Sequence, residues 1–257
     1  MDASQADLKK VASYIKECQR LVILTGAGVS KESGIPTFRD KMTGLWEGYD
    51  PAKMATPEGF LKDPSLVWRW YDWRRKLVGE VQPNAGHVAM ASLEARSSAL
   101  ESGPDHFTLV TQNVDRLHQR AGSTRVLELH GNIVTFRCFE RGHQAHESIP
   151  FDLEFPPLCR CGALLRPNVV WFGEALPAAV LSAASQVARQ CDLMLVVGTS
   201  ALVQPAASLP YMALEGGAKV IEINPNETAL TEDATTFLKG ASGVVMPQLV
   251  RFLDGVN

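Results

Sequence analysis

The 257-residue chain has no run of about 18 apolar residues, the length that a helix needs to cross a membrane. Its first 20 residues, MDASQADLKKVASYIKECQR, are polar and acidic at the start and contain no apolar core of the kind found in signal peptides. These absences exclude membrane-spanning and secreted proteins. We therefore expect a soluble, cytoplasmic protein with no membrane partner.

Strong charge of either sign is also missing. The 25 Lys and Arg residues nearly balance the 28 Asp and Glu residues, which leaves a formal net charge of -3, and no basic block occurs. Nucleic-acid binding depends on a concentrated positive surface. We expect no direct nucleic-acid partner. Nothing in the sequence fixes the oligomeric state, and we favour a monomer.

Cysteine is scarce, with five residues in all. An odd number of cysteines in a chain without a secretion signal argues against a disulfide framework. Three of them, Cys138, Cys159 and Cys161, fall in one short region. Such a cluster indicates a metal site.

The cysteine cluster departs from the usual zinc ribbon, which has two C-x-x-C pairs. Arg141 stands where the second cysteine of the first pair would be, and the second pair is C-x-C. Three thiolates and one imidazole would still form a closed tetrahedral set for Zn²⁺, with His143 as the nearest candidate and His146 as the next. The alternative is a degenerate ribbon without metal.

A dinucleotide fingerprint is incomplete in the segment LVILTGAGVSKESGIPTFRD, residues 21–40. The apolar run Leu21–Leu24 leads into Gly26-Ala27-Gly28, as a buried strand does when it delivers backbone amides such as that of Gly26 to a phosphate group. Lys31 occupies the position of the third glycine of G-x-G-x-x-G. The segment therefore predicts a phosphate-binding loop that differs from that of dehydrogenases.

Apolar segments alternate with helical patterns along the chain. Besides residues 21–24, the strand candidates are residues 106–113, 192–200, 218–226 and 243–247, and the strand-like VLEL precedes His130. Helical patterns occupy residues 5–20, 83–96 and 178–190. This alternation predicts an α/β fold, a Rossmann-like doubly wound parallel sheet.

Two segments interrupt the alternation. Residues 41–82 are rich in Trp, Pro and charge, and residues 135–167 carry the cysteine cluster. We expect them to form a smaller inserted lobe with a helical part and a zinc-ribbon-like part. Residues 1–40, 83–134 and 168–257 would then form the Rossmann-like domain.

Short polar residues follow several predicted strands: Thr25-Gly26, Gln112-Asn113, Gly198-Thr199-Ser200 and Asn224-Pro225-Asn226. In a doubly wound sheet the carboxyl ends of the strands share one rim, where hydroxyl and amide groups bind ribose and base. Each segment alone is more simply a strand-to-helix turn with a cap residue. Their number on one rim favours a nucleotide site.

Two histidines have different expected roles. His130 lies between an apolar strand and Gly131, and a neutral imidazole there could remove a proton from a hydroxyl near pH 7. A hydrogen-bonded structural histidine is the alternative for His130. His118 lies in a helical pattern with Arg116 and Arg120, and we expect it on the surface.

The segment WRWYDWRRK, residues 68–76, places Tyr71 and Arg74 at i and i+3 on one helix face. A phenol and a guanidinium that converge in an apolar pocket suit a carboxylate. The alternative is a half-buried helix whose arginines face water.

Six motifs in order identify a family resemblance. The chain resembles the sirtuins, the NAD-dependent protein-lysine deacylases, from about residue 21 to residue 247. The motifs are GAGVSKESGIPTFRD, TQNVDRLHQRAG, LHGN, LRPNVVWFGEALP, VVGTSALVQPAA and INPNET. The resemblance implies that NAD is consumed as a co-substrate and that acyl-lysine proteins or peptides are the partners. The implied products are nicotinamide, 2′-O-acyl-ADP-ribose and free lysine.

The resemblance also implies roles for individual residues. His130 would be the general base, and Asn113 would be catalytic with it. The implied NAD contacts are Gly26, Ala27, Gly28, Ser30, Ile35, Phe38, Arg39, Gln112, Asn113, Asp115, Gly198, Thr199, Ser200, Asn224, Asn226 and Ala241. Zn²⁺ would be structural and remote from the reaction.

The acyl group and the peptide have their own implied contacts. Tyr71, Arg74 and Ala55 resemble the branch of the family that removes malonyl and succinyl as well as acetyl groups. The peptide would add as a strand, and its implied contacts are Val170, Phe172, Gly173 and Glu174, with residues 198–203 on its other side. ADP-ribosyl transfer, NAD hydrolysis and a non-catalytic NAD or ADP-ribose sensor are the alternatives.

Overall fold

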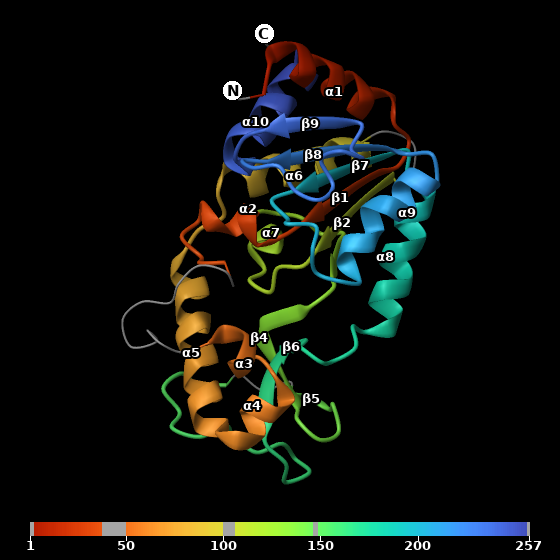
Figure 1. Ribbon diagram of the computed structural model, residues 1–257. Coiled ribbons are helices and arrows are strands. Elements are labelled where there is room, and N and C mark those ends of the chain that lie inside the picture. Colours follow the sequence, from red (N-terminus) through yellow and green to blue (C-terminus); the bar gives the residue numbers. More distant parts are fainter. Residues whose placement is uncertain (1–2, 38–49, 100–105, 146–148, 256–257) are drawn as a thin grey trace.

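The computed structural model describes residues 3–37, 50–99, 106–145 and 149–255 (Figure 1). Three residues named above, Phe38, Arg39 and His146, lie outside these ranges.

A parallel six-stranded sheet forms the larger part of the molecule, with the strand order β3-β2-β1-β7-β8-β9 (Figure 1). Its strands are β1 (Leu21–Thr25), β2 (Phe107–Thr111), β3 (Val126–Glu128), β7 (Leu193–Val197), β8 (Lys219–Asn224) and β9 (Thr236–Lys239). Every residue of β1 and β7 is buried, because these two central strands are covered on both faces. The predicted α/β fold is confirmed.

Successive residues of β1 enter two different apolar cores. Leu21 and Ile23 pack with side chains of α1, α6 and α10, whereas Val22 and Leu24 pack with those of α8 and α9. The covering helices are α1 (Gln5–Glu17), α6 (Ala85–Ala99), α8 (Ala178–Gln190), α9 (Leu209–Glu215) and α10 (Ser242–Leu253). Helices on both faces make the sheet doubly wound, as predicted.

The strand order reverses beside β1. The chain continues from β1 to β2 and β3 on one side, and the later strands β7, β8 and β9 lie on the other side. Open parallel sheets bind their ligands at such a switch point, outside the carboxyl ends of the strands. The fold thus places the expected site between the turns that follow β1, β2, β7 and β8. Short helices near these turns are α2 (Ala27–Lys31), α7 (Leu117–Arg120) and the 3₁₀ helix η3 (Ala206–Ser208).

A smaller part with its own sheet lies at the opposite end of the molecule (Figure 1). It contains the antiparallel strands β4 (Gly131–Cys138), β5 (Gln144–Ala145) and β6 (Leu165–Val169). Its helices are α3 (Pro51–Met54), α4 (Pro57–Lys62) and α5 (Pro64–Glu80), which follow the caps Asp50, Thr56 and Asp63. Because β4 and β6 continue across the predicted boundaries at 134/135 and 167/168, the exact division into domains stays a prediction.

One predicted strand is wrong. Residues 243–247 belong to α10, in which Val245, Met246 and Leu249 are buried at helical spacing despite Pro247. A short apolar run cannot by itself distinguish a strand from a buried helical turn. The edge strand that the sequence analysis missed is β9, a four-residue segment that pairs with β8.

None of the helices in the described ranges combines the length and the apolar character required to span a membrane.

Candidate active site

The turn after β1 packs directly on the turn after β7. The amide of Gly26 donates to the carbonyl oxygen of Val197 at 3.1 Å, and the amide of Gly28 donates to that of Gly198 at 2.8 Å. A Cβ atom on Gly28 would lie 2.6 Å from the Gly198 oxygen. The glycines are therefore needed for close backbone approach. The Gly26 amide, which the sequence suggested as a phosphate donor, is instead hydrogen-bonded to a backbone carbonyl oxygen of the protein.

Three of the predicted rim segments meet at Thr199. The side-chain amide of Gln112, after β2, donates to the Thr199 hydroxyl at 3.0 Å. The side-chain amide of Asn224, at the end of β8, donates to the Thr199 carbonyl oxygen at 2.7 Å. The turns are thus joined to one another and are not isolated caps. They form a polar rim at the expected place.

A buried polar chain lies beside this rim. The Asn113 side-chain amide donates to the Ser30 hydroxyl at 3.0 Å, and that hydroxyl donates to the Asp115 carboxylate at 2.7 Å. The Leu117 amide donates to the other Asp115 oxygen at 2.8 Å. Burial raises the pKa of Asp115 above its ordinary value, although these donors and nearby arginines oppose the shift. The chain fixes the orientation of the Asn113 side chain.

His130 is held where the rim meets the smaller sheet. Its Nδ1 lies 2.9 Å from the Gln112 carbonyl oxygen. Because that oxygen can only accept, Nδ1 carries the proton and Nε2 keeps its lone pair. Burial lowers the pKa of His130, while the bond to Gln112 partly opposes the shift. The imidazole is therefore neutral at pH 7 and able to act as a base.

The backbone around His130 also joins the two sheets. Gly131 has a φ of 68°, and a Cβ atom there would lie 2.0 Å from the Asn168 carbonyl oxygen, so only glycine fits. The Val170 amide donates to the His130 carbonyl oxygen at 2.9 Å. This contact brings the predicted peptide segment next to the base.

His118 is not on the surface, so that prediction is wrong. Only 1% of its side chain is exposed, its Nε2 lies 3.0 Å from the Thr25 hydroxyl, and its ring centroid lies 4.8 Å from that of His87. The helix α7 is a single turn. It is too short for a helical pattern to define an exposed face. The surface prediction for His118 relied on its charged neighbours in the sequence, Arg116 and Arg120.

Tyr71 and Arg74 lie close together on α5, as their spacing predicts. The Arg74 Cζ atom is 6.0 Å from the centre of the Tyr71 ring. Tyr71 is buried in the same apolar cluster as Ala55 and Ile35, whereas Arg74 is half-buried. Burial raises the pKa of Tyr71 to about 12 although Arg74 opposes the shift, so the phenol keeps its proton. Apolar side chains, a neutral phenol and a guanidinium thus share one region.

The predicted peptide segment follows β6. The Phe172 amide donates to the Ala55 carbonyl oxygen at 2.9 Å, and the Phe172 side chain is 49% exposed. Gly173 has a φ of 86°. The Glu174 carboxylate is engaged within the protein, because it pairs with Arg166 and Arg137. Phe172 is therefore the side chain of this segment that faces solvent most openly.

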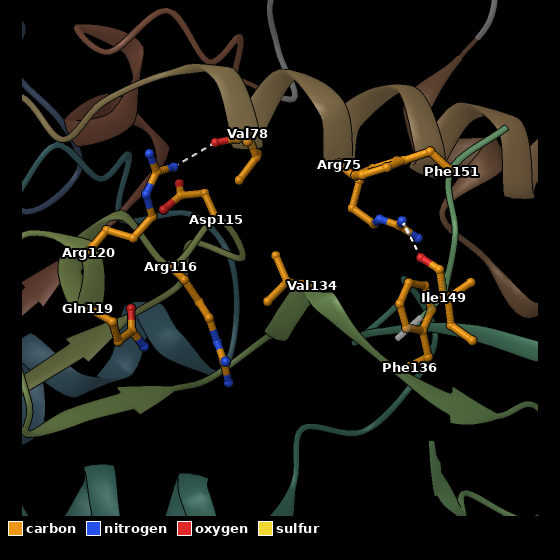
Figure 2. A pocket seen from close by; sticks show the side chains of 11 residues that line it. Arg75, Val78, Asp115, Arg116, Gln119, Arg120, Val134, Phe136, Ile149 and Phe151 are labelled. Atoms are coloured by element: carbon orange, nitrogen blue, oxygen red, sulfur yellow. Dashed lines mark hydrogen bonds between the residues drawn. The ribbon is translucent and has the colours of Figure 1, made fainter. Parts of the chain in front are cut away.

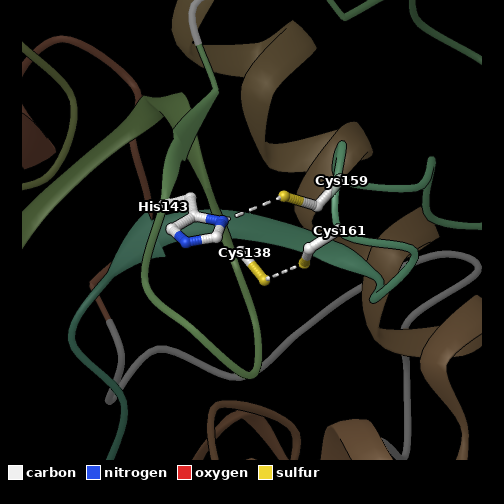
Figure 3. A group of neighbouring side chains, drawn as sticks. All are labelled: Cys138, His143, Cys159 and Cys161. Atoms are coloured by element: carbon white, nitrogen blue, oxygen red, sulfur yellow. Dashed lines mark hydrogen bonds between the residues drawn. The ribbon is translucent and has the colours of Figure 1, made fainter.

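The cysteine cluster forms a closed group at the end of the small sheet (Figure 3). The ligand atoms of Cys138, His143, Cys159 and Cys161 all lie within 4.8 Å of one another. The Sγ atoms of Cys138 and Cys161 are 3.5 Å apart, and Cys159 Sγ is 3.7 Å from His143 Nδ1.

This donor set fits Zn²⁺. Tetrahedral zinc with bonds of about 2.0–2.3 Å places its ligand atoms roughly 3.5–3.8 Å apart. Among the described residues, His143 completes the group as a fourth donor. It is the nearer of the two candidates that the sequence left open, and the other, His146, lies outside the described residues. β4 runs from Gly131, beside His130, to Cys138, so roughly 20 Å of strand separates the metal group from the base. A zinc ion there would be structural.

A cavity of about 750 Å³ opens between α5, α7 and β4 (Figure 2). Its lining residues are Arg75, Val78, Gly79, Asp115, Arg116, Gln119, Arg120, Val134, Phe136, Ile149 and Phe151. Of this described lining, Asp115 alone belongs to the predicted NAD contacts. The guanidinium groups are bound inside the protein: Arg75 to the Ile149 carbonyl oxygen, and Arg120 to that of Val78. Through Asp115 the cavity lies next to the polar rim, but the rim residues Gln112, Thr199 and Asn224 do not line it.

Two further residues are part of the site's framework: Thr25, which belongs to a predicted rim segment, and Trp171, which the sequence analysis did not single out. Thr25, at the end of β1, donates to the Thr111 hydroxyl at 2.8 Å, and that hydroxyl accepts from the Asn113 amide. Trp171 donates from its indole nitrogen to the Tyr71 hydroxyl oxygen at 2.8 Å. For Trp171 the only available signal was its position in sequence between the predicted site residues Val170 and Phe172.

The comparisons with known proteins agree with one another. Residues 26–205 match the model of the Sir2 family. The chain is 50% identical over 234 residues to the NAD-dependent protein deacylase of Aquifex aeolicus, an alignment that covers 91% of this chain and 95% of that protein. The crystal structure of a complex of a Sir2 homolog with NAD superposes with a TM-score of 0.89 at 47% identity, over 99% of this chain and 96% of that one. A structure of Sir2 bound to acetylated peptide superposes with a TM-score of 0.82 at 30% identity, over 97% and 99%.

Proposed function

The chain belongs to the Sir2 family, and from this premise we propose that it is an NAD-dependent protein deacylase that uses His130 as its general base. The observation that carries the residue assignment is the position of His130. It is a neutral imidazole held by Gln112 at the cofactor rim and, through Val170, at the predicted peptide segment. A sensor without turnover has no need of a base at this junction.

The rim and the buried polar chain supply the groups that NAD requires. We assign Thr199 and Asn224 to the adenosine half of NAD, and Gln112, Asn113 and Asp115 to the nicotinamide and its ribose. When bound, NAD supplies a ribose carbon whose bond to nicotinamide can be broken. Because Ser30 connects Asn113 with Asp115, the nicotinamide end is bound by groups already oriented before the ligand arrives.

His130 acts through Nε2. With its proton fixed on Nδ1 by Gln112, the ring would take a proton from a ribose hydroxyl and pass it to the lysine nitrogen as the acyl group is transferred to that hydroxyl oxygen. The acyl oxygen would replace nicotinamide on the ribose carbon, and one water molecule would be consumed. The products are nicotinamide, 2′-O-acyl-ADP-ribose and free lysine.

Tyr71 and Arg74 extend the acyl range to malonyl and succinyl groups. A guanidinium binds a terminal carboxylate strongly when the surroundings are apolar, and the neutral phenol donates a further hydrogen bond. Ala55, buried in the same cluster, leaves room for the longer chain. Acetyl groups remain substrates because they need no carboxylate contact.

The protein partner is an acyl-lysine peptide. It lies along Val170 and Phe172 on one side and residues 198–203 on the other, where it adds main-chain hydrogen bonds as a further strand. The exposed side chains of Phe172, Leu202 and Val203 offer apolar contacts on both sides.

The test is mass spectrometry of matched acetyl-, malonyl- and succinyl-lysine peptides incubated with the protein, with and without NAD. We expect NAD-dependent loss of all three groups, formation of acyl-ADP-ribose and faster loss of the acidic groups. Loss of acetyl alone would remove the acyl-preference proposal. Nicotinamide release without any acyl peptide would favour NAD hydrolysis or ADP-ribosyl transfer.

A further inference from the structure

Trp171 and Tyr71 form a buried pair between β6 and α5. The indole nitrogen of Trp171 donates to the Tyr71 hydroxyl oxygen at 2.8 Å, and each side chain is only 1% exposed. The two rings are stacked, with centroids 6.2 Å apart. The contact is thus both a hydrogen bond and a packing contact.

This bond dictates where the Tyr71 proton points. An indole nitrogen can only donate, so the Tyr71 oxygen is the acceptor and its own proton must be directed elsewhere. The phenol keeps that proton at physiological pH because burial raises its pKa. Tyr71 is therefore held as a donor facing away from Trp171.

Trp171 is itself fixed on two sides. The Arg166 guanidinium carbon lies 3.2 Å from the centre of the Trp171 ring system, and Arg166 is pinned by Glu174 and by the Val169 carbonyl oxygen. Glu174 also accepts from the Trp171 backbone amide at 2.8 Å. The guanidinium above the ring and the anchored backbone together restrict the indole to a single orientation. The bond to Tyr71 is thus preorganised.

We propose that Trp171 is a positioning residue for acidic acyl groups. By accepting from Trp171, Tyr71 is oriented to donate to the terminal carboxylate of a dicarboxylic acyl chain, and Arg74 supplies the countercharge. The proposal rests on the proposed function, in which Tyr71, Arg74 and Ala55 form the acyl pocket, and it adds Trp171 to that set. It concerns binding of the acyl carboxylate and leaves proton transfer at His130 unchanged.

The test is the variant Trp171→Phe, which keeps an aromatic ring under Arg166 but removes the donor. Trp68→Phe is the matched control. Trp68 is an equally buried tryptophan on α5 whose indole nitrogen has no hydrogen-bond partner among the described residues. Steady-state kinetics are measured with succinyl- and acetyl-lysine versions of one peptide. We expect W171F to raise the KM for the succinyl peptide about fivefold to tenfold more than that for the acetyl peptide, the effect of one hydrogen bond, with kcat nearly equal. W68F should leave the ratio of the two KM values unchanged.

A double-mutant cycle with Tyr71→Phe separates positioning from packing. If Trp171 acts through the Tyr71 hydroxyl, W171F changes the succinyl KM by less than twofold in the Y71F background. Equal effects of W171F in both backgrounds, or equal losses for both peptides, would overturn the role of Trp171 while leaving the acyl pocket intact. Failure of the parent protein to process the succinyl peptide would overturn the acyl pocket and this inference together.

Discussion

His130 donates from Nδ1 to the Gln112 carbonyl oxygen at 2.9 Å, and the side chain of the same glutamine binds Thr199. One residue therefore ties the proposed base to the polar rim. The arrangement sets the tautomer of the imidazole and its position relative to the cofactor groups at the same time.

Replacing His130 by alanine should lower kcat by about 10²–10⁴-fold, the usual contribution of a general base. His130→Gln is the matched variant, since its amide can still donate to Gln112 but cannot accept a proton at neutral pH. Both variants should be equally inactive in a nicotinamide-release assay with an acetyl peptide. Retention of near-normal turnover by either variant would exclude the base role.

Arg74→Met should weaken the removal of succinyl groups far more than that of acetyl groups, because it removes the charge that faces the carboxylate but retains much of the apolar stem. We expect a loss in kcat/KM of at least about tenfold for the succinyl peptide and less than threefold for the acetyl peptide. Arg69→Met, on the exposed face of the same helix, is the control. Equal losses for the two peptides would contradict the carboxylate contact.

The zinc prediction concerns metal content and stability. We expect one zinc ion per chain by elemental analysis, its loss on Cys161→Ser, and a lower melting temperature for the zinc-free protein, because the ion joins β4 to the loop that carries Cys159. Cys18→Ser is the control, since Cys18 lies in α1's C-terminal cap, outside the metal group. Absence of stoichiometric metal from the parent protein would show that the group is a ribbon without zinc.

The buried histidine pair predicts an acid-sensitive stability. Burial lowers the pKa of His87 to about 4 and that of His118 to about 3, whereas an unfolded histidine titrates near 6.5. Below pH ~6.5 the unfolded chain binds more protons, so the free energy of unfolding falls as the pH drops, by roughly 1.4 kcal/mol per pH unit for each histidine. Above pH ~6.5 this contribution is complete.

Urea denaturation at pH 7, 6 and 5 measures this slope. His118→Gln should start from a lower stability, because it disturbs the contact with Thr25, but should show a shallower decline towards pH 5. An unchanged slope would mean that His118 does not remain neutral in the folded protein.

Much of the site was predictable because it follows buried parallel strands. The apolar runs located β1, β2, β7 and β8, and the polar residues after them had to share a rim once the sheet was parallel. The i, i+3 spacing of Tyr71 and Arg74 likewise defined one face of α5.

Other features depended on packing that periodicity does not encode. His118 lies between Arg116 and Arg120 in a pattern typical of surface helices, yet in the folded protein it is buried against His87. Residues 243–247 contain an apolar run that suits either a strand or a helix. In the folded protein this run is helical, because α10 packs against α6 and α1.

The sequence by itself determined the alternation of strands and helices, the order of the motifs and the presence of a cysteine cluster, because these follow from local composition and spacing. Only the tertiary structure decided that the Gly26 amide is used internally, that Gln112 orients His130 and that Trp171 donates to Tyr71. Each of these contacts joins segments 18 to 171 residues apart. Such hydrogen bonds depend on how strands and lobes pack, and no local pattern specifies that packing.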